Sequence, residues 1–482
     1  MTTFLIGLVI LFVGGALYGK FCEHVFHPDD RQTPAYRLED GVDYVPMKSW
    51  KNSLINLLNI AGTGPILGPI QGILFGPIAF ITIPIGCVIG GAMHDYFSGM
   101  LSLRNDGEQM PALVRRYTNK GIFNIYNIFV TLLMFLVGAV FIYTPGDIAA
   151  TQLFGFSGAV DAPSTWIIYA VIFAYYLAAT VFPIDKVIGK IYPIFGAILL
   201  FSAIGVFIGL FTKGYKLDNF TGLIGQDHFI PVFFITVACG ILSGFHSTQT
   251  AIIARSVNTE KEGRMTFYNM MILEGFIAMI WAAAAMGAYN GGLAVVGETG
   301  ATAVVGIVAK DMLGSVGGFL AILGVIVLPI TSGDTALRSA RLMIADWLHI
   351  DQKDYKKRLG LSAIIFAVVA VVLYWSKSNP NGFTILWRYF AWSNQTIALF
   401  ALAIISIYLI QNRGGLYFLM PLVPGMFYAF VTFSFICNAK IGFNLPWGIA
   451  YALGVVFALA YAGITIWSGK KRAAANPIKT QA

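Results

Sequence analysis

The sequence contains few charged residues and few cysteines. Only 11% of its 482 residues are Asp, Glu, Lys or Arg, whereas a soluble protein of this length carries about 25%. The four cysteines are scattered and form no CxxC pair, so they indicate neither a disulfide framework nor a zinc site. No long polar block stands apart from the rest, which leaves no room for a separate soluble domain. These absences argue against an ordinary soluble enzyme and against a nucleic-acid-binding module.

Hydrophobic residues dominate the chain instead. They make up 57% of it, and the mean hydropathy is +0.74. Apolar runs of about 18 residues or more, each long enough to cross a membrane as a helix, recur from end to end. The sequence therefore predicts an all-α, multi-pass membrane protein. We expect about thirteen transmembrane helices, at 3–19, 53–75, 77–101, 122–143, 164–182, 190–212, 230–254, 265–289, 315–337, 359–376, 384–410, 416–437 and 446–468.

The basic residues between these runs predict the topology. If the N-terminus lies outside, 25 of the 31 Lys and Arg residues fall in cytoplasmic loops and the C-terminal tail, and 6 fall outside. Such an excess of basic residues on the cytoplasmic side supports an odd number of spans with a cytoplasmic C-terminus. The net charge of +8 is then explained by membrane topology and needs no acidic partner.

The segment 59–77, NIAGTGPILGPIQGILFGP, contains five glycines and three prolines. Proline removes a backbone donor and glycine weakens a helix, so a continuous helix is not expected. A broken helix within a membrane is tolerated where it lines a cavity or is buried in protein. The segment therefore predicts a discontinuous helix at a binding site; a Pro-kinked packing helix is the alternative. The candidate binding residues are Gly62, Thr63, Gly64, Pro65, Gly68 and Gln71.

The seventh run, 230–254, offers a counterpart. Its middle carries Gly240 and Gly244, followed by a polar group at 246–250. Side chains this polar are costly at mid-membrane unless they are partnered or hydrated. This run crosses the membrane in the direction opposite to the second. Paired broken helices are typical of inverted-repeat transporters. We therefore predict four parts: a first span and cytoplasmic loop at 1–52, five-helix repeats at 53–212 and 230–410, and two further spans with a basic tail at 411–482.

Ionisable residues within the runs are further candidates. His94 and Asp95 lie toward the inner end of the third run, and Glu274 lies about ten residues into the eighth. A carboxylate beside an imidazole can bind and release a proton near neutral pH. The alternative for the first two is a helix-end pair that ties neighbouring helices together. The alternative for Glu274 is a carboxyl that is simply protonated or paired with a basic partner.

The ninth and eleventh runs also carry polar groups. Pro329 and Gly333 loosen the ninth, so its free carbonyls, together with side-chain oxygens, could coordinate a dehydrated Na+. The alternative is an inner helix end whose hydroxyls bond back to the backbone. In the eleventh, Asn394 lines the cavity or bonds between helices. The candidate coupling-ion residues of the ninth run are Thr331, Ser332, Asp334 and Thr335.

Two long motifs carry a family resemblance. GTGPILGPIQGILFGPIAF, followed by GGAMHDYFSGMLSLRNDG, resembles the carbon starvation protein A (CstA) family, and the later TSGDTALRSAR and WSNQ segments sit where that family has polar blocks. The resemblance covers nearly the whole chain, which looks like a short member. It implies a bacterial inner-membrane transporter with a LeuT-like fold, related to the amino acid–polycation–organocation superfamily. Members are linked to peptide uptake on carbon starvation, and relatives to pyruvate uptake with protons.

Residues and resemblance together predict a mechanism. A carboxylate-bearing substrate such as a peptide, an amino acid or pyruvate would bind between the two broken helices, because free N–H groups at helix N-termini favour anions. By analogy with LeuT-like folds, Na+ would bind between the 62–65 carbonyls and the ninth run, or a protonatable group would replace it. No other cofactor is expected. The seventh run would contribute Phe245, His246, Ser247 and Gln249.

Two other classes of function stay open from the sequence. A membrane-embedded enzyme would need a nucleophile with a base, or a metal with three ligands, and the sequence contains no HExxH or GxSxG motif. A passive channel would need a continuous pore and would not concentrate its substrate. The sequence does not predict the oligomeric state.

Overall fold

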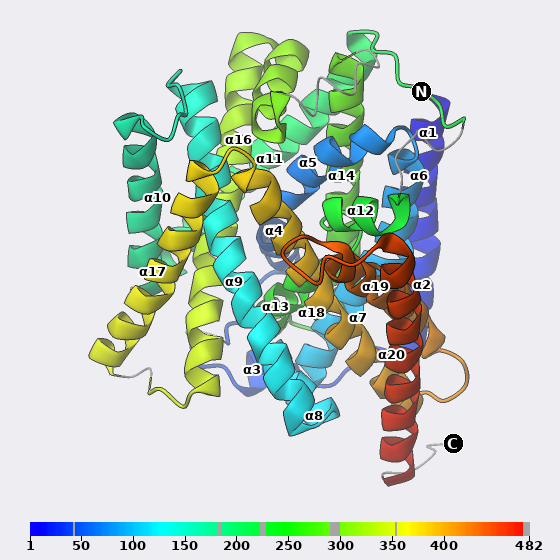
Figure 1. Cartoon of the computed structure of the whole chain (residues 1–482). Helices are drawn as coiled ribbons and strands as arrows, with labels where there is room; N and C mark the ends of the chain where they lie inside the picture. Colours follow the sequence, from blue (N-terminus) through cyan, green and yellow to red (C-terminus); the bar gives the residue numbers. More distant parts are fainter. Residues whose placement is uncertain (42–43, 182–184, 222–227, 290–298, 352–353, 476–482) are drawn as a thin grey trace.

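The described protein is a bundle of helices. A computed structural model describes the chain except for residues 42–43, 182–184, 222–227, 290–298, 352–353 and 476–482 (Figure 1), and side chains are described outside 179–193. The helices of the first half are α1 (Thr2–Val9), α2 (Gly15–Phe26), α3 (Pro34–Arg37), α4 (Ser49–Ile60), α5 (Gly64–Gly72), α6 (Ala79–Gly86), α7 (Ala92–Arg104), α8 (Met110–Tyr117), α9 (Lys120–Ile148), α10 (Pro163–Val181) and α11 (Asp185–Thr212). Those of the second half are α12 (Phe229–Thr236), α13 (Gly244–Ile253), α14 (Asn269–Ala288), α16 (Ala301–Trp347), α17 (Tyr355–Ser378), α18 (Gly382–Asn412), α19 (Leu419–Asn438) and α20 (Trp447–Ala475).

These helices agree with a multi-pass membrane protein. Each of the thirteen apolar runs falls on a helix or a pair of helices. Within the described residues, ten helices are long and apolar enough to cross a membrane, and the bent pair of α4 with α5 would make eleven. The helix at 163–178 is apolar but shorter, and α12 and α13 are each too short to cross alone. The count of thirteen spans stays a prediction.

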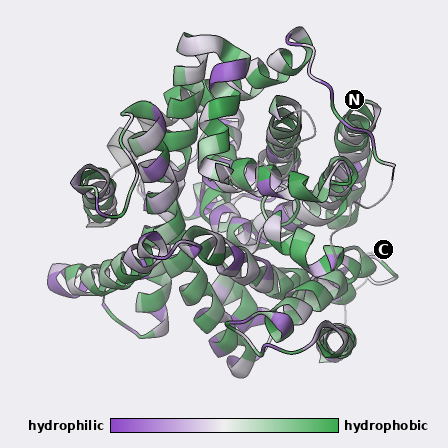
Figure 2. Ribbon diagram, turned by 45° about the horizontal axis from the view of Figure 1, so that its top comes forward, coloured by the Kyte–Doolittle hydropathy of each residue, from purple (hydrophilic) through white to green (hydrophobic). Residues whose placement is uncertain are grey.

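The exterior of this molecule is apolar, unlike that of a soluble protein. Large apolar side chains such as Leu17, Val456 and Trp467 point outward and are more than 60% exposed, and hydrophobic residues extend along most of the helices (Figure 2). Polar residues such as His246 and Asn394 are completely buried. An apolar exterior matches hydrocarbon, whereas buried polar groups in a membrane mark functional positions.

The second span is broken, as predicted, but not at a proline. Helix α4 ends at Ile60 and α5 begins at Gly64, and the two axes bend by 48°. The break precedes both Pro65 and Pro69. Pro65 instead lies in the first turn of α5, where proline is tolerated because its missing N–H has no helical partner anyway. Pro69 lies within α5.

The seventh span is broken as well. Helix α12 ends at Thr236, and α13 begins only at Gly244. In the non-helical segment 237–243, Gly240 has a φ of 89°, which an L side chain rarely adopts. A Cβ there would also lie 2.7 Å from the Cβ of Ala278, so glycine lets this segment approach α14. Both predicted discontinuous helices are therefore present.

Candidate functional site

Four ionisable side chains meet beside the break in the seventh span, and all of them are completely buried. The two oxygens of Asp95 face two imidazoles: Nδ1 of His94 lies 2.8 Å from one, and Nδ1 of His246 lies 2.9 Å from the other. The second ring nitrogen of His246, Nε2, lies 3.4 Å from an oxygen of Glu274. The structure thus unites His94, Asp95, His246 and Glu274, which the sequence placed on three separate spans.

Asp95 is completely buried in α7, which continues beyond it for nine residues to Arg104. Its place toward the inner end of a membrane span stays a prediction. A π-helical turn at Cys87–Gly91 directly precedes α7. Such turns are rare and occur often at functional sites, because they shift which side chains face the interior.

Asn394 connects α18 to the start of α13. Its side-chain oxygen accepts a hydrogen bond of 2.7 Å from the backbone N–H of Phe245, and its amide donates to the hydroxyl of Ser243 at 3.0 Å. Gly244 allows this approach, because a Cβ there would lie 2.3 Å from the carbonyl oxygen of Asn394. The backbone N–H of Phe245, which has no partner within α13, is therefore hydrogen-bonded to Asn394 in this conformation.

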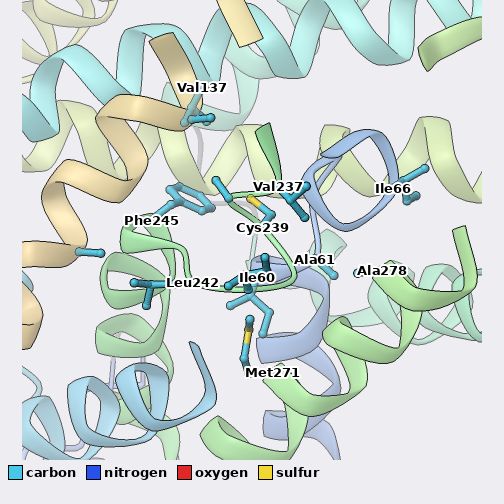
Figure 3. Close-up of a cluster of buried hydrophobic side chains, with 14 of the residues drawn as sticks. Ile60, Ala61, Ile66, Val137, Val237, Cys239, Leu242, Phe245, Met271 and Ala278 are labelled. Atoms are coloured by element: carbon cyan, nitrogen blue, oxygen red, sulfur yellow. The ribbon is translucent and has the colours of Figure 1, made fainter. Parts of the chain in front are cut away.

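The two broken spans touch each other directly. A Cβ on Gly64 would lie 2.1 Å from the Cβ of Cys239, and one on Gly68 would lie 3.3 Å from the carbonyl oxygen of Thr236. Figure 3 shows Cys239 and Val237 beside Ile60 and Ala61, at the breaks. The glycines of α5 therefore let one broken helix lie against the non-helical segment of the other.

A cavity of about 310 Å³ lies on the side of the bundle that holds the N-terminus. Residues of both broken spans line it, including Gln71 of α5 and Thr236 of α12. The start of α16, at Ala301, and Arg388 of α18 complete the wall. The cavity thus reaches the end of α12, three residues before Cys239.

The polar residues of the ninth span lie in α16 and bond mostly to backbone. Thr331 donates to the carbonyl of Leu328 at 2.8 Å, and Thr335 donates to that of Ser332 at 3.0 Å. Ser332 also donates to the carbonyl of Leu58 at 3.0 Å, which joins α16 to the last turn of α4.

Asp334, on the same helix, is buried. It accepts a hydrogen bond of 2.8 Å from the hydroxyl of Tyr175 in α10. The sequence gave no reason to single out Tyr175, because a tyrosine in an apolar run is usually a packing residue.

The other predicted residues are buried without joining the ionisable group. The hydroxyl of Ser247 donates to the carbonyl of Gly244, and the amide of Gln249 donates to the hydroxyl of Thr248. Thr63 and Gly62 lie at the break of the second span. Sequence reasoning missed Cys239, although its position beside Gly240 in the predicted break was the one available signal.

Comparisons with known proteins agree on a family. A family model described as carbon starvation protein CstA matches residues 1–204, 146–296 and 281–435. The chain is 40% identical over 341 residues to an uncharacterized membrane protein of Haemophilus influenzae, covering 60% of this chain and 92% of the relative. Proteins named peptide transporter CstA, from Escherichia coli and Bacillus subtilis, are 24% and 23% identical. The alignments cover 86% and 90% of this chain and 78% and 89% of the relatives.

The fold is also similar to that of a solved transporter. The crystal structure of a manganese transporter of Eremococcus coleocola superposes with a TM-score of 0.62, covering 88% of this chain and 94% of that chain at 12% identity. At this identity the similarity concerns the fold alone.

Proposed function

This chain belongs to the carbon starvation protein CstA family, and from that membership we propose that it is a secondary active transporter of the bacterial inner membrane. Its N-terminus would lie outside and its C-terminus in the cytoplasm. The finer architecture that we propose is a LeuT-like arrangement of thirteen spans, with five-helix inverted repeats at 53–212 and 230–410.

The single observation that carries the proposal is the meeting of the two breaks. The start of α5 contacts the non-helical segment 237–243 at Cys239, directly beside the buried ionisable group. Broken helices that meet inside a bundle are how transporters build a central site for alternating access. A cavity reaches this region from one side.

The substrate that we propose is a small carboxylate-bearing nutrient: a peptide, an amino acid or pyruvate. Two relatives are named peptide transporters. The N-termini of α5 and α13 at the breaks offer positive helix-dipole ends to a carboxylate. In α13 the amide of Phe245 is bonded to Asn394, so a substrate there would replace that bond.

Import would be driven by a gradient of Na+ or of protons. Thr331, Ser332, Asp334 and Thr335 stay the predicted ligands for Na+, and the bond of Ser332 to Leu58 puts this helix against the broken span. His94, Asp95 and Glu274 stay the predicted proton carriers.

Uptake into proteoliposomes tests the proposal. Labelled pyruvate, amino acids and small peptides are offered under a Na+ gradient and, separately, under a proton gradient. We expect one gradient to drive concentrative, saturable uptake of at least one carboxylate. If neither gradient changes uptake of any of them, symport is wrong; unsaturable flux that never concentrates the substrate would indicate a channel.

Two variants test the position of the site. Gly64→Leu and His246→Ala should abolish this uptake, whereas Gly463→Leu, where nothing lies within 4 Å of the added Cβ, and His24→Ala, at an exposed position, should retain it. Elution profiles and melting temperatures show which variants remain folded. Normal uptake by both site variants would mean that the site lies elsewhere.

A further inference from the structure

We propose that Cys239, His246 and Glu274 form a binding site for a divalent metal ion of the zinc type. Each residue offers one ligand atom, and the sulfur, the ring nitrogen and the carboxylate oxygen all lie within 4.8 Å of one another. Ligand atoms around a tetrahedral zinc ion are roughly 3–4 Å apart. The nitrogen and the oxygen already have this spacing, at 3.4 Å. Small side-chain movements would bring the sulfur into place.

The orientation of His246 suits a metal ligand. Nδ1 lies 2.9 Å from Asp95 and donates to it if that carboxyl is ionised, which leaves the lone pair on Nε2. This is the arrangement by which carboxylates hold metal-bound histidines in one tautomer and one orientation. Asp95 is held in turn by His94 on its other oxygen. The imidazole is therefore fixed with its free nitrogen toward Glu274 and Cys239.

The ligand atoms are short of partners within the described residues. Nε2 of His246 and both oxygens of Glu274 are buried and have no hydrogen bond of ordinary geometry, although the backbone amide of Gly240 faces Glu274 and the thiol of Cys239 faces His246. Two acceptors facing each other at 3.4 Å need positive charge between them. A proton there would satisfy the nitrogen and the oxygen, and the sulfur of Cys239 already contacts the hydroxyl of Ser243 at 3.9 Å and the amide of Asn394 at 3.7 Å. A metal ion would use all three ligand atoms at once.

The mixture of donors selects the kind of ion. Thiolate and imidazole ligands favour zinc and its chemical relatives, while magnesium, calcium and manganese prefer all-oxygen sites. Three protein ligands leave the fourth tetrahedral position open, as in zinc sites that bind a further molecule. The absence of a CxxC pair does not conflict with this, because the other two ligands come from α13 and α14.

The break in the seventh span is what places the sulfur. Gly240 turns the chain with its positive φ and lies against Ala278, four residues beyond Glu274 on α14. The cavity on the N-terminal side is lined by Thr236, three residues before Cys239, and Cys239 keeps 7% of its surface exposed. A bound ion would fasten the non-helical segment to α13 and α14.

Cobalt binding by the purified full-length protein in detergent tests the site. Co2+ replaces zinc, and a thiolate ligand gives it a charge-transfer absorption band that nitrogen and oxygen ligands do not. We expect one Co2+ per chain with this band. Cys239→Ser should lose the band, and Glu274→Gln should bind at least about tenfold more weakly. Asp95→Asn should weaken binding by about tenfold or more, because it frees the imidazole.

Cys437→Ser is the matched control, because Cys437 is also buried but lies on α19, outside the site. It should bind Co2+ like the unmodified protein. Melting temperatures identify any variant that fails to fold. If Cys239→Ser does not fold, Glu274→Gln, which keeps the side-chain shape, tests the site through its weaker Co2+ binding. A folded protein without the band, or a band that persists in Cys239→Ser, overturns the site. Neither result bears on transport, because no substrate or gradient is involved.

Discussion

At the scale of single residues, the glycines of α5 act through contact. From the sequence we expected Gly64 and Gly68 to take part in substrate binding. In the structure Gly64, Gly68 and Gly72 recur at every fourth position, where a Cβ would meet Cys239, Thr236 and Val237 respectively. Residues four apart lie on one face of a helix. The composition showed that the segment was unusual. The residues that leave room only for glycine lie on the other broken span, which the composition did not indicate.

Gly64→Ala should destabilise the protein. The added Cβ would lie 2.1 Å from the Cβ and 2.2 Å from the Sγ of Cys239, so one broken span must shift. Overpacking of this kind costs about 1–3 kcal/mol, and thermal melting in detergent measures it. Gly463→Ala on α20 is the control: with nothing within 4 Å, it should be neutral or slightly stabilising. Equal melting of the two variants would contradict the packing role of Gly64.

At the scale of elements, the sequence predicted that two spans break but not where. Both signals were local: glycine and proline density selected 59–77, and two glycines followed by a polar group selected 230–254. The exact break depends on what replaces the helical hydrogen bonds. Proline is compatible with a first helical turn, so Pro65 begins α5, and the break falls at Ala61–Thr63.

Asn394→Ala should weaken the start of α13. The side-chain oxygen accepts from the backbone N–H of Phe245 in the first turn, as a helix cap does. Its loss leaves a buried donor unpaired and should cost about 1–2 kcal/mol. Hydrogen–deuterium exchange should show faster exchange at 244–248, together with a lower melting temperature.

Asn412→Ala is the matched control on the same helix. Asn412 donates only to the carbonyl of Tyr408, one turn earlier, and it lies at the helix end. It should leave the exchange of α13 unchanged. If the two alanine variants show the same exchange at 244–248, Asn394 does not cap α13.

At the scale of the whole molecule, the hydrophobicity of the sequence predicted where the helices lie. It did not predict which distant residues lie close together. Apart from the breaks at 61–63 and 237–243, the apolar runs coincide with helix in the part of the chain that the structure describes, because membrane insertion depends mostly on local hydrophobicity. The bond between Asp95 and His246 joins residues 151 positions apart. Nothing in the spacing of the two motifs indicated that they share a site. Resemblance to the family suggested how the spans are arranged, but the contacts between individual side chains depend on the folded structure.

Contacts between distant segments also close the end of the bundle opposite the cavity. Arg104 of α7 donates to both oxygens of Glu260, at 2.9 and 2.8 Å, and also to the hydroxyl of Tyr408 and the carbonyl of His27. Glu260 is completely buried and accepts from the backbone N–H of Asp29 as well. One ion pair thus joins α7, α18 and the segments before α3 and before α14. In the alternating access that we propose, this end would open while the other closes.

Glu260→Gln should therefore loosen this end. Removing one charge of a buried bidentate pair costs at most about 3–5 kcal/mol. The cost here should lie toward the lower end, because Asp29, 3.9 Å from the guanidinium of Arg104, remains as a partly exposed counterion. We expect a clearly lower melting temperature and faster protease cleavage between residues 27 and 48. Because the carboxylate is not exposed, the difference should persist in high salt. Lys261→Gln is the control: its pair with Asp30 is largely exposed and should contribute about 0–1 kcal/mol. Unchanged melting and cleavage in Glu260→Gln would show that this end is held closed by other contacts.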